Sequence, residues 1–295
     1  MTDFNYEGVG VALPTPFDEN GDIDFLSLER IINHVVEGGV DYIVALGTTA
    51  ETPTLTKDEK YNLSAFIREI VNDRVPMIIG IGGNNTKAVA IKINSFDLTG
   101  YSAILSVTPY YNRPTQEGLF QHFKNIVDSS PLPIVLYNVP SRTGVNMEAD
   151  TTIRLSRYSS KITAIKEASG KVEQCREIIE KAQTGFSLIS GDDSSTCGLM
   201  SIGAKGVISV LANALPKAVE DFVNCCKNGH HEKALICHKQ FLPLIHPLFE
   251  EGNPAGLKAL LSNLGLCKNI LRLPLTPVNK EVEGNLLKAA RPFIY

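Results

Sequence analysis

The 295-residue chain lacks the features of several large classes of proteins. No apolar run approaches the roughly 20 residues that cross a bilayer, and the first residues have neither the basic nor the apolar stretch of a secretory signal. A formal net charge of −4 gives the chain no excess of positive charge that would attract nucleic acid or an anionic membrane. We therefore expect a cytoplasmic protein that binds neither nucleic acid nor membrane.

The common metal and nucleotide motifs are also missing. The histidines show neither H-x-H nor H-E-x-x-H spacing, the cysteines form no C-x-x-C pair, and no P-loop or G-x-G-x-x-G is present. The six cysteines are Cys175, Cys197, Cys225, Cys226, Cys237 and Cys267. We expect them to be reduced and to pack as small apolar side chains. His230, His231 and His238 fall in a polar helical stretch and are expected at the solvated surface, so no metal site is predicted.

What the chain does contain is a regular alternation of short apolar runs and helical patterns. Strands are expected at residues 9–13, 42–46, 77–81, 103–107, 134–137, 162–166, 187–190 and 206–210. These runs are continuously apolar rather than alternating, which is typical of parallel strands buried on both faces. Eight such units predict an α/β fold, a (β/α)8 TIM barrel.

Helix signals fill the segments between the runs. Phe25 to Val36 has helical spacing and ends at Gly38-Gly39, and Thr56 with Glu59 forms a capping box. Further helices are expected at residues 86–98, 116–127 and 215–226. The residues after 228 are predicted to be helical, with breaks at residues 252–254 and 273–274. We therefore predict a catalytic barrel over residues 1–228 and a C-terminal helical extension over residues 229–295.

Lys166 closes the sixth predicted strand. Active sites of TIM barrels lie at the C-terminal ends of the strands, and lysine is almost never fully buried unless it is paired or used. A desolvated amine is a usable nucleophile, as in Schiff-base enzymes. On this stretch alone, an ordinary exposed charge is the competing interpretation.

Other polar residues follow the predicted strands at the same end. They are Thr48 and Thr49, Tyr110 and Tyr111, Tyr137, Arg142 and Gly191. Each has a structural explanation as well: threonines cap turns, tyrosines pack in cores and loops, and an isolated arginine pairs at the surface. Together with Lys166 they favour proton transfer around a covalent imine, with a substrate carboxylate held by arginine.

Three motifs carry a resemblance to a known family. They are Gly47-Thr48-Thr49-Ala50-Glu51, Tyr137-Asn138-Val139-Pro140-Ser141-Arg142-Thr143-Gly144 and Lys166-Glu167-Ala168-Ser169-Gly170. They resemble the dihydrodipicolinate synthases, which belong to the pyruvate-dependent class I aldolase superfamily together with N-acetylneuraminate lyase. The resemblance covers nearly the whole chain. Arg142 is its discriminating feature, because sialic-acid lyases typically lack an arginine at that position.

The resemblance implies a lyase that condenses pyruvate with L-aspartate 4-semialdehyde in the diaminopimelate route to L-lysine. It implies that Lys166 forms an imine with pyruvate and that no cofactor is needed, because the imine is itself the electron sink. The resemblance also implies a proton relay of Tyr137, Thr49 and Tyr111. Substrate would be bound by Thr48, Thr49 and Arg142, with Thr48 helping to hold the pyruvate carboxylate near Thr49 and Arg142 receiving the carboxylate of the semialdehyde. Backbone groups at Gly191 and Ile208 would line the pocket. Tyr111 would serve the site of a neighbouring chain, and a homotetramer built as a dimer of dimers is expected.

The chain departs from the family pattern in two places. Ala50 replaces the usual glycine of the strand-two motif and would strain the turn if that position needs a positive φ. A possible effector site for lysine matches at Asn84 and Tyr110, but Lys57 stands where a histidine is usual and Ala88 where a glutamate is usual. A cationic effector would meet an added cation and lose its counter-charge, so we predict weak or absent inhibition by lysine.

Two alternatives remain open at this stage. The first is another pyruvate lyase or aldolase of the same superfamily that cleaves a sugar acid. The second is a barrel without catalytic activity that serves as a regulator or binding protein, since fold alone does not determine function.

Overall fold

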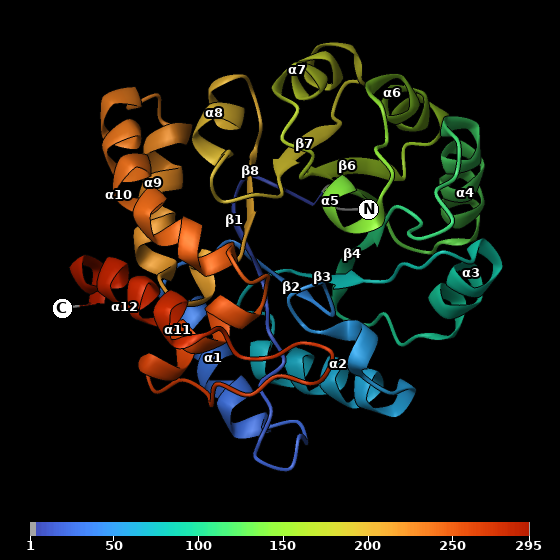
Figure 1. The fold of residues 1–295 in the computed structure, drawn as a ribbon. Helices are drawn as coiled ribbons and strands as arrows, with labels where there is room; N and C mark the ends of the chain where they lie inside the picture. Colours follow the sequence, from blue (N-terminus) through green and yellow to red (C-terminus); the bar gives the residue numbers. More distant parts are fainter. Residues whose placement is uncertain (1–3, 295) are drawn as a thin grey trace. The chain divides into compact units, whose positions relative to one another are not determined.

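The computed structural model describes residues 4–294, and Figure 1 labels its strands and helices. Eight strands within these residues pair in the order β1 to β8 as a closed barrel. The strands are β1 Gly8–Ala12, β2 Tyr42–Ala45, β3 Met77–Gly80, β4 Tyr101–Val107, β5 Ile134–Asn138, β6 Ile162–Glu167, β7 Ser187–Ser190 and β8 Gly206–Ser209. Every residue of β1, β2, β5 and β8 is buried. The predicted TIM barrel is therefore confirmed, and the continuously apolar strands are those of a sheet covered on both faces.

Helices separate and follow the strands. They are α1 Phe25–Glu37, α2 Lys57–Val71, α3 Thr86–Ser95, α4 Gln116–Ser129, α5 Pro140–Thr143, α6 Ala149–Tyr158, α7 Val172–Lys181, α8 Thr196–Ser201, α9 Pro216–Lys227, α10 His231–Phe249, α11 Ala255–Asn263 and α12 Lys280–Ile294. Short 3₁₀ turns occupy Thr52–Thr54 and Leu211–Asn213. No helix among these described residues is long and apolar enough to cross a membrane.

The chain divides into two compact units. The first contains the described residues up to Glu7 together with Met77–Ile208, which carry β3 to β7 and most of β8. The second contains Gly8–Pro76 and the described residues from Ser209 onward, with β1, β2 and the C-terminal helices. The predicted boundary at residue 228 remains a prediction.

Local signals account for most element ends. Thr56 accepts a hydrogen bond from the Glu59 backbone, and the Glu59 carboxylate accepts one from the Thr56 backbone, so the predicted capping box is confirmed. Helix α3 stops at Ser95, three residues earlier than predicted, because Phe96 turns extended. The carboxylate of Asp97 then accepts a hydrogen bond from the Thr99 backbone and forms a turn.

The C-terminal region is helical with the two predicted breaks. Helix α11 follows the first break, and its residues 255–261 are all buried. A helix that is apolar on all sides belongs inside a protein, and Lys258 is the charged exception in this one. His230 and His231 are exposed as predicted, but His238 is half-buried and stacks on Phe222, so its expected place at the solvated surface was wrong.

Candidate active site

Lys166 and Tyr137 face each other across neighbouring strands of the first unit. The register of β5 and β6 pairs these two residues directly. The Lys166 Nζ atom lies 4.6 Å from the centroid of the Tyr137 ring. Both side chains are buried, with 5% and 7% of their surfaces exposed. A buried amine and a phenol are thus held side by side at the C-terminal end of their strands.

A second buried lysine shows what is unusual about the first. Lys258 in the second unit has no exposed side-chain surface, and its ammonium group is 2.5 Å from the Glu51 carboxylate. Lys166 has no carboxylate partner among residues 4–294. Since a buried lysine is normally paired or used, pairing explains Lys258, and Lys166 has the environment of a nucleophilic amine.

The absence of a side chain at Gly191 makes room for the side chain of Lys166. A Cβ atom at position 191 would lie 3.1 Å from Lys166 Cγ and 2.8 Å from Ala168 Cβ. The Gly191 amide also donates to the Glu167 carbonyl at 2.8 Å. Position 191 therefore requires a residue without a side chain next to the lysine.

Next to Lys166 and Tyr137, a network of buried hydrogen bonds connects strands β5 and β6. Glu167 and Asn138 directly follow Lys166 and Tyr137 and are paired in the same register. The Glu167 carboxylate accepts hydrogen bonds from the side-chain amides of Asn138 and Gln174 and from the Ser169 backbone. Burial raises the pKa of Glu167. The sequence motifs contained Glu167 and Asn138, but the sequence analysis assigned them no role.

The loop after β5 carries Arg142 on the one-turn helix α5. Its side chain is exposed, and the helix ends at Gly144 with a φ of +73°. Arg113 donates from Nε to the Gly144 carbonyl at 3.0 Å, which ties the loop after β4 to the loop with Arg142. The sequence analysis missed Arg113, because no local pattern marks a contact between two loops.

The loop after β4 presents Tyr111 to solvent. The Tyr111 side chain is 90% exposed, and its backbone has a φ of +72°, which is rare for an aromatic residue. Asn84 donates to the Tyr110 carbonyl at 3.2 Å, and Asn112 donates to the Asn84 carbonyl at 3.1 Å. The structure thus brings together two residues of the possible effector site, Asn84 and Tyr110.

The strand-two motif lies in the second unit and forms a compact turn. Thr49 is buried and Thr48 is half-buried. Ala50 does not have a positive φ, which instead occurs at Leu46 and Glu51. The strain that Ala50 would cause in a left-handed turn is therefore absent.

The remaining predicted residues lie on well-defined elements. Ile208 is buried in β8, next to Val207, which pairs with Ser190 of β7. Lys57 is exposed at the first position of α2, with its ammonium 5.7 Å from the centroid of the Tyr61 ring. Among residues 4–294, no group of three or more His, Cys, Asp or Glu side chains is arranged to hold a metal ion.

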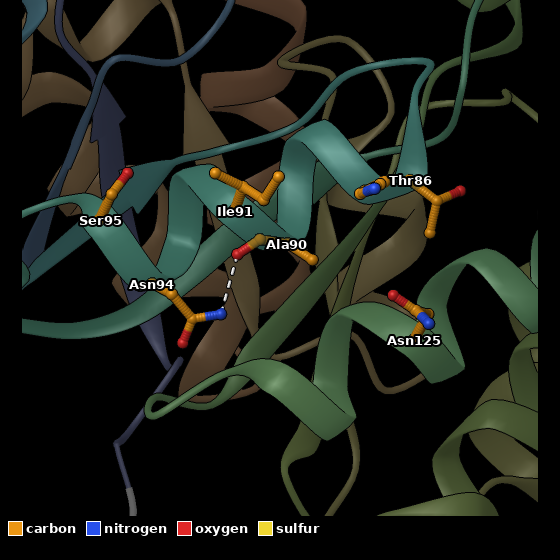
Figure 2. Close-up of a pocket in the computed structure, with 7 residues that line it drawn as sticks. Thr86, Ala90, Ile91, Asn94, Ser95 and Asn125 are labelled. Atoms are coloured by element: carbon orange, nitrogen blue, oxygen red, sulfur yellow. Dashed lines mark hydrogen bonds between the residues drawn. The ribbon is translucent and has the colours of Figure 1, made fainter.

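An open groove of about 680 Å³ lies elsewhere, on helices α3 and α4 (Figure 2). Its lining residues are Thr86, Lys87, Ala90, Ile91, Asn94, Ser95 and Asn125. Lys87 is the one charged side chain among these seven. All seven lie on helices α3 and α4, and none lies in a loop directly after a strand. The groove therefore contains none of the predicted catalytic groups.

The closed parallel barrel, with polar residues after its strands, places the protein among the (β/α)8-barrel enzymes. Residues 5–291 match the Dihydrodipicolinate synthetase family, and the chain belongs to that family.

Individual relatives agree with this assignment. The chain is 48% identical to a 4-hydroxy-tetrahydrodipicolinate synthase of Azobacteroides pseudotrichonymphae over 97% of both chains. A solved dihydrodipicolinate synthase from Thermotoga maritima superimposes with a TM-score of 0.95 at 38% identity, covering 98% of this chain and 99% of that one. A dihydrodipicolinate synthase from Acinetobacter baumannii, solved in complex with pyruvate, has a TM-score of 0.94 at 38% identity with the same coverage.

Proposed function

We propose that this chain is the enzyme that condenses pyruvate with L-aspartate 4-semialdehyde to 4-hydroxy-tetrahydrodipicolinate. The observation that carries the proposal is the buried pair of Lys166 and Tyr137, in which the amine has no carboxylate partner among the described residues. The relatives that bear this name, and the neighbour solved with pyruvate, support the choice of substrates.

The proposed reaction begins with attack of the Lys166 amine on the ketone carbon of pyruvate. The carbonyl oxygen leaves as water and an imine forms. Loss of a proton from the methyl carbon gives an enamine, whose carbon adds to the aldehyde of the semialdehyde. The amino group of the second substrate then displaces Lys166 as the ring closes, which returns the lysine to its free form.

The other residues have roles that follow from their chemistry and from the family motifs. Tyr137, Thr49 and Tyr111 pass protons between the reacting atoms, as hydroxyls at hydrogen-bond reach can. Thr48 holds the carboxylate of pyruvate, and the planar guanidinium of Arg142 suits the carboxylate of the semialdehyde. Backbone groups at Gly191 and Ile208 line the pocket, for which the close approach of Gly191 to Lys166 is the support.

Trapping of the imine tests the proposal. Borohydride reduction in the presence of pyruvate is expected to attach the pyruvate carbons irreversibly to Lys166, as mapped by mass spectrometry of peptides. The peptide with Lys258 is an internal control, because that lysine is equally buried but paired. An adduct on any other lysine, or none at all, would contradict the mechanism.

A substrate panel then tests the second half of the reaction. A coupled assay with aspartate semialdehyde is expected to show turnover, and sugar acids such as N-acetylneuraminate are expected to show none. The reverse pattern would assign the protein to another branch of the aldolase superfamily. Lysine trapping without turnover of either substrate would contradict the proposed condensation.

We also propose that the working form is a cytoplasmic homotetramer, a dimer of dimers. An aromatic side chain held 90% exposed with a positive φ, as at Tyr111, supports a role at the site of a neighbouring chain. Six free cysteines suit a reducing compartment. Sedimentation should give the mass of four 32.1-kDa chains, and a monomer would contradict the assembly.

A further inference from the structure

The hydroxyl of Thr49 receives a hydrogen bond from a residue far along the chain. The side-chain amide nitrogen of Asn253 donates to Thr49 Oγ1 at 3.0 Å. Asn253 lies in the break between α10 and α11, in the same unit as Thr49. The two side chains are buried, with 8% and 2% of their surfaces exposed, so water does not compete freely for this contact.

The direction of this hydrogen bond determines what Thr49 can do. A hydroxyl has one proton to donate and two lone pairs that accept, whereas an amide N–H only donates. When Thr49 Oγ1 accepts from Asn253, its own proton remains available for another acceptor.

We propose that Asn253 is a positioning residue that holds Thr49 as an acceptor, so that Thr49 donates its own proton into the relay. This inference rests on the proposed function, in which Thr49 belongs to that relay.

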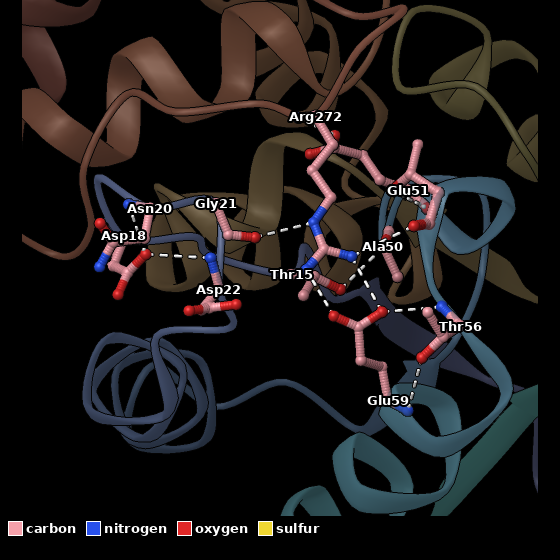
Figure 3. Close-up of polar contacts among 11 residues, drawn as sticks. Thr15, Asp18, Asn20, Gly21, Asp22, Ala50, Glu51, Thr56, Glu59 and Arg272 are labelled. Atoms are coloured by element: carbon pink, nitrogen blue, oxygen red, sulfur yellow. Dashed lines mark hydrogen bonds and ion pairs between the residues drawn. The ribbon is translucent and has the colours of Figure 1, made fainter.

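The backbone of the Thr49 turn is held by contacts in which Asn253 takes no part. Thr15 donates to the Ala50 carbonyl at 2.8 Å (Figure 3), and Thr52 donates to the Gly47 carbonyl at 2.8 Å. The carboxylate of Glu51 accepts from the ammonium of Lys258 and from the backbone of Arg272. Loss of the Asn253 amide should therefore alter the hydroxyl of Thr49 and leave the turn in place.

The C-terminal segment that carries Asn253 is anchored to the same region. Arg272 makes two hydrogen bonds to the Glu59 carboxylate and donates to the Gly21 carbonyl (Figure 3), and it also donates to the Thr54 carbonyl. The Lys258 ammonium and the Arg272 guanidinium lie 4.2 and 4.5 Å from the centroid of the Phe17 ring. These anchors hold the segment next to the turn, so Asn253 meets Thr49 on a rigid support.

Substitutions at Asn253 test the inference. Asn253→Ala removes the donor, and kcat is expected to fall about tenfold or more, as when a step of proton transfer is impaired. The KM for pyruvate is expected to change less than kcat, because Thr48, the residue proposed to hold the carboxylate of pyruvate, is not altered. Asn253→Asp keeps the shape but presents an acceptor that takes the proton of Thr49, so its kcat is expected to be lower still.

A matched control and a thermal melt separate positioning from folding. Asn263→Asp makes the same chemical change at an exposed residue of α11 and should leave kcat and the melting temperature unchanged. A folded Asn253→Ala protein with wild-type kcat would overturn the inference. So would an Asn253→Asp protein that is as active as the wild type.

A double-mutant cycle with Thr49→Val decides whether Asn253 acts through Thr49. If it does, the double variant of Asn253→Ala and Thr49→Val is no slower than Thr49→Val alone. Independent, additive losses would overturn the positioning role while leaving the proposed function intact. A fully active Thr49→Val protein would remove Thr49 from the relay and overturn the positioning role, whereas its turnover would leave the proposed condensation intact.

Discussion

Lys166 and Lys258 show that burial by itself does not give a lysine its role. Burial lowers the pKa of Lys258, whereas the Glu51 carboxylate beside it acts in the opposite direction. The ammonium of Lys258 and the carboxylate of Glu51 form an ion pair inside the protein. Lys166 is buried to a similar degree but faces the ring of Tyr137 and the bare backbone of Gly191. The difference lies in the neighbours, which leave one amine engaged and the other open to a substrate.

The contact between Gly191 and Lys166 leads to a prediction at the scale of one residue. Gly191→Ala places a methyl group where it collides with Ala168 and Lys166, and it displaces the reacting amine. A misplacement of about 1 Å can cost about 100-fold in rate, so we expect kcat to fall by about that factor. Steady-state kinetics with both substrates measure the loss.

Gly198 provides the control for this prediction. It lies in α8, and a Cβ atom there would meet no atom within 4 Å. Gly198→Ala is expected to keep wild-type kcat and stability. If Gly191→Ala is as active as Gly198→Ala, the position of Lys166 does not depend on the missing side chain.

Among the secondary-structure elements, α2 shows how the C-terminal region is attached within its own unit. The first turn of α2 presents Glu59, which closes the capping box and also binds the guanidinium of Arg272. The hydrogen bonds from Arg272 lower the pKa of Glu59 to about 2, with the contact to the Thr56 backbone contributing in the same direction. One carboxylate thus serves both a local helix start and a contact over more than 200 residues.

This attachment predicts a pH dependence of stability. Because the pKa of Glu59 is lower in the folded than in the unfolded protein, its contribution is complete above about pH 4.3, the usual pKa of glutamate. It is lost as the pH falls toward about 2. Glu59→Gln keeps the capping box but removes the charge, and should lower the free energy of unfolding at pH 7 by on the order of 1 kcal/mol after solvent screening.

Urea unfolding at pH 7 and at pH 3 measures this effect. The difference between wild type and Glu59→Gln should shrink at the lower pH. Glu232→Gln, at an exposed residue of α10, is the control and should show no such difference at either pH. A difference that stays constant down to pH 3 would show that the charge of Glu59 is not what stabilises the contact.

For the whole molecule, the predicted response to lysine rests on the amino-acid types at four positions. Asn84 and Tyr110 are in contact in the first unit, whereas Lys57 belongs to the second. Ala88 is exposed near the start of α3 and carries no charge. A cationic effector would gain no carboxylate from Ala88, and a lysine in place of the usual histidine at position 57 adds a like charge, so we expect its binding to be disfavoured electrostatically.

We therefore expect L-lysine to inhibit weakly or not at all. Initial rates measured at rising lysine concentrations check this, and strong inhibition at submillimolar lysine would contradict it. A variant that combines Ala88→Glu with Lys57→His supplies the missing counter-charge and removes the added cation. This variant is expected to become more sensitive to lysine than the wild type.

The amino-acid sequence by itself determined the strands, the capping box, the family and the position of Lys166 at the end of its strand. These features depend on periodicity and on contacts within a few residues, which a single stretch of sequence records. Only the tertiary structure decided that Tyr137 faces Lys166, that Glu51 pairs with Lys258 and that Asn253 bonds Thr49. The last two contacts join residues more than 200 positions apart. Such contacts exist only once the chain has folded, because no local pattern in either segment specifies its partner.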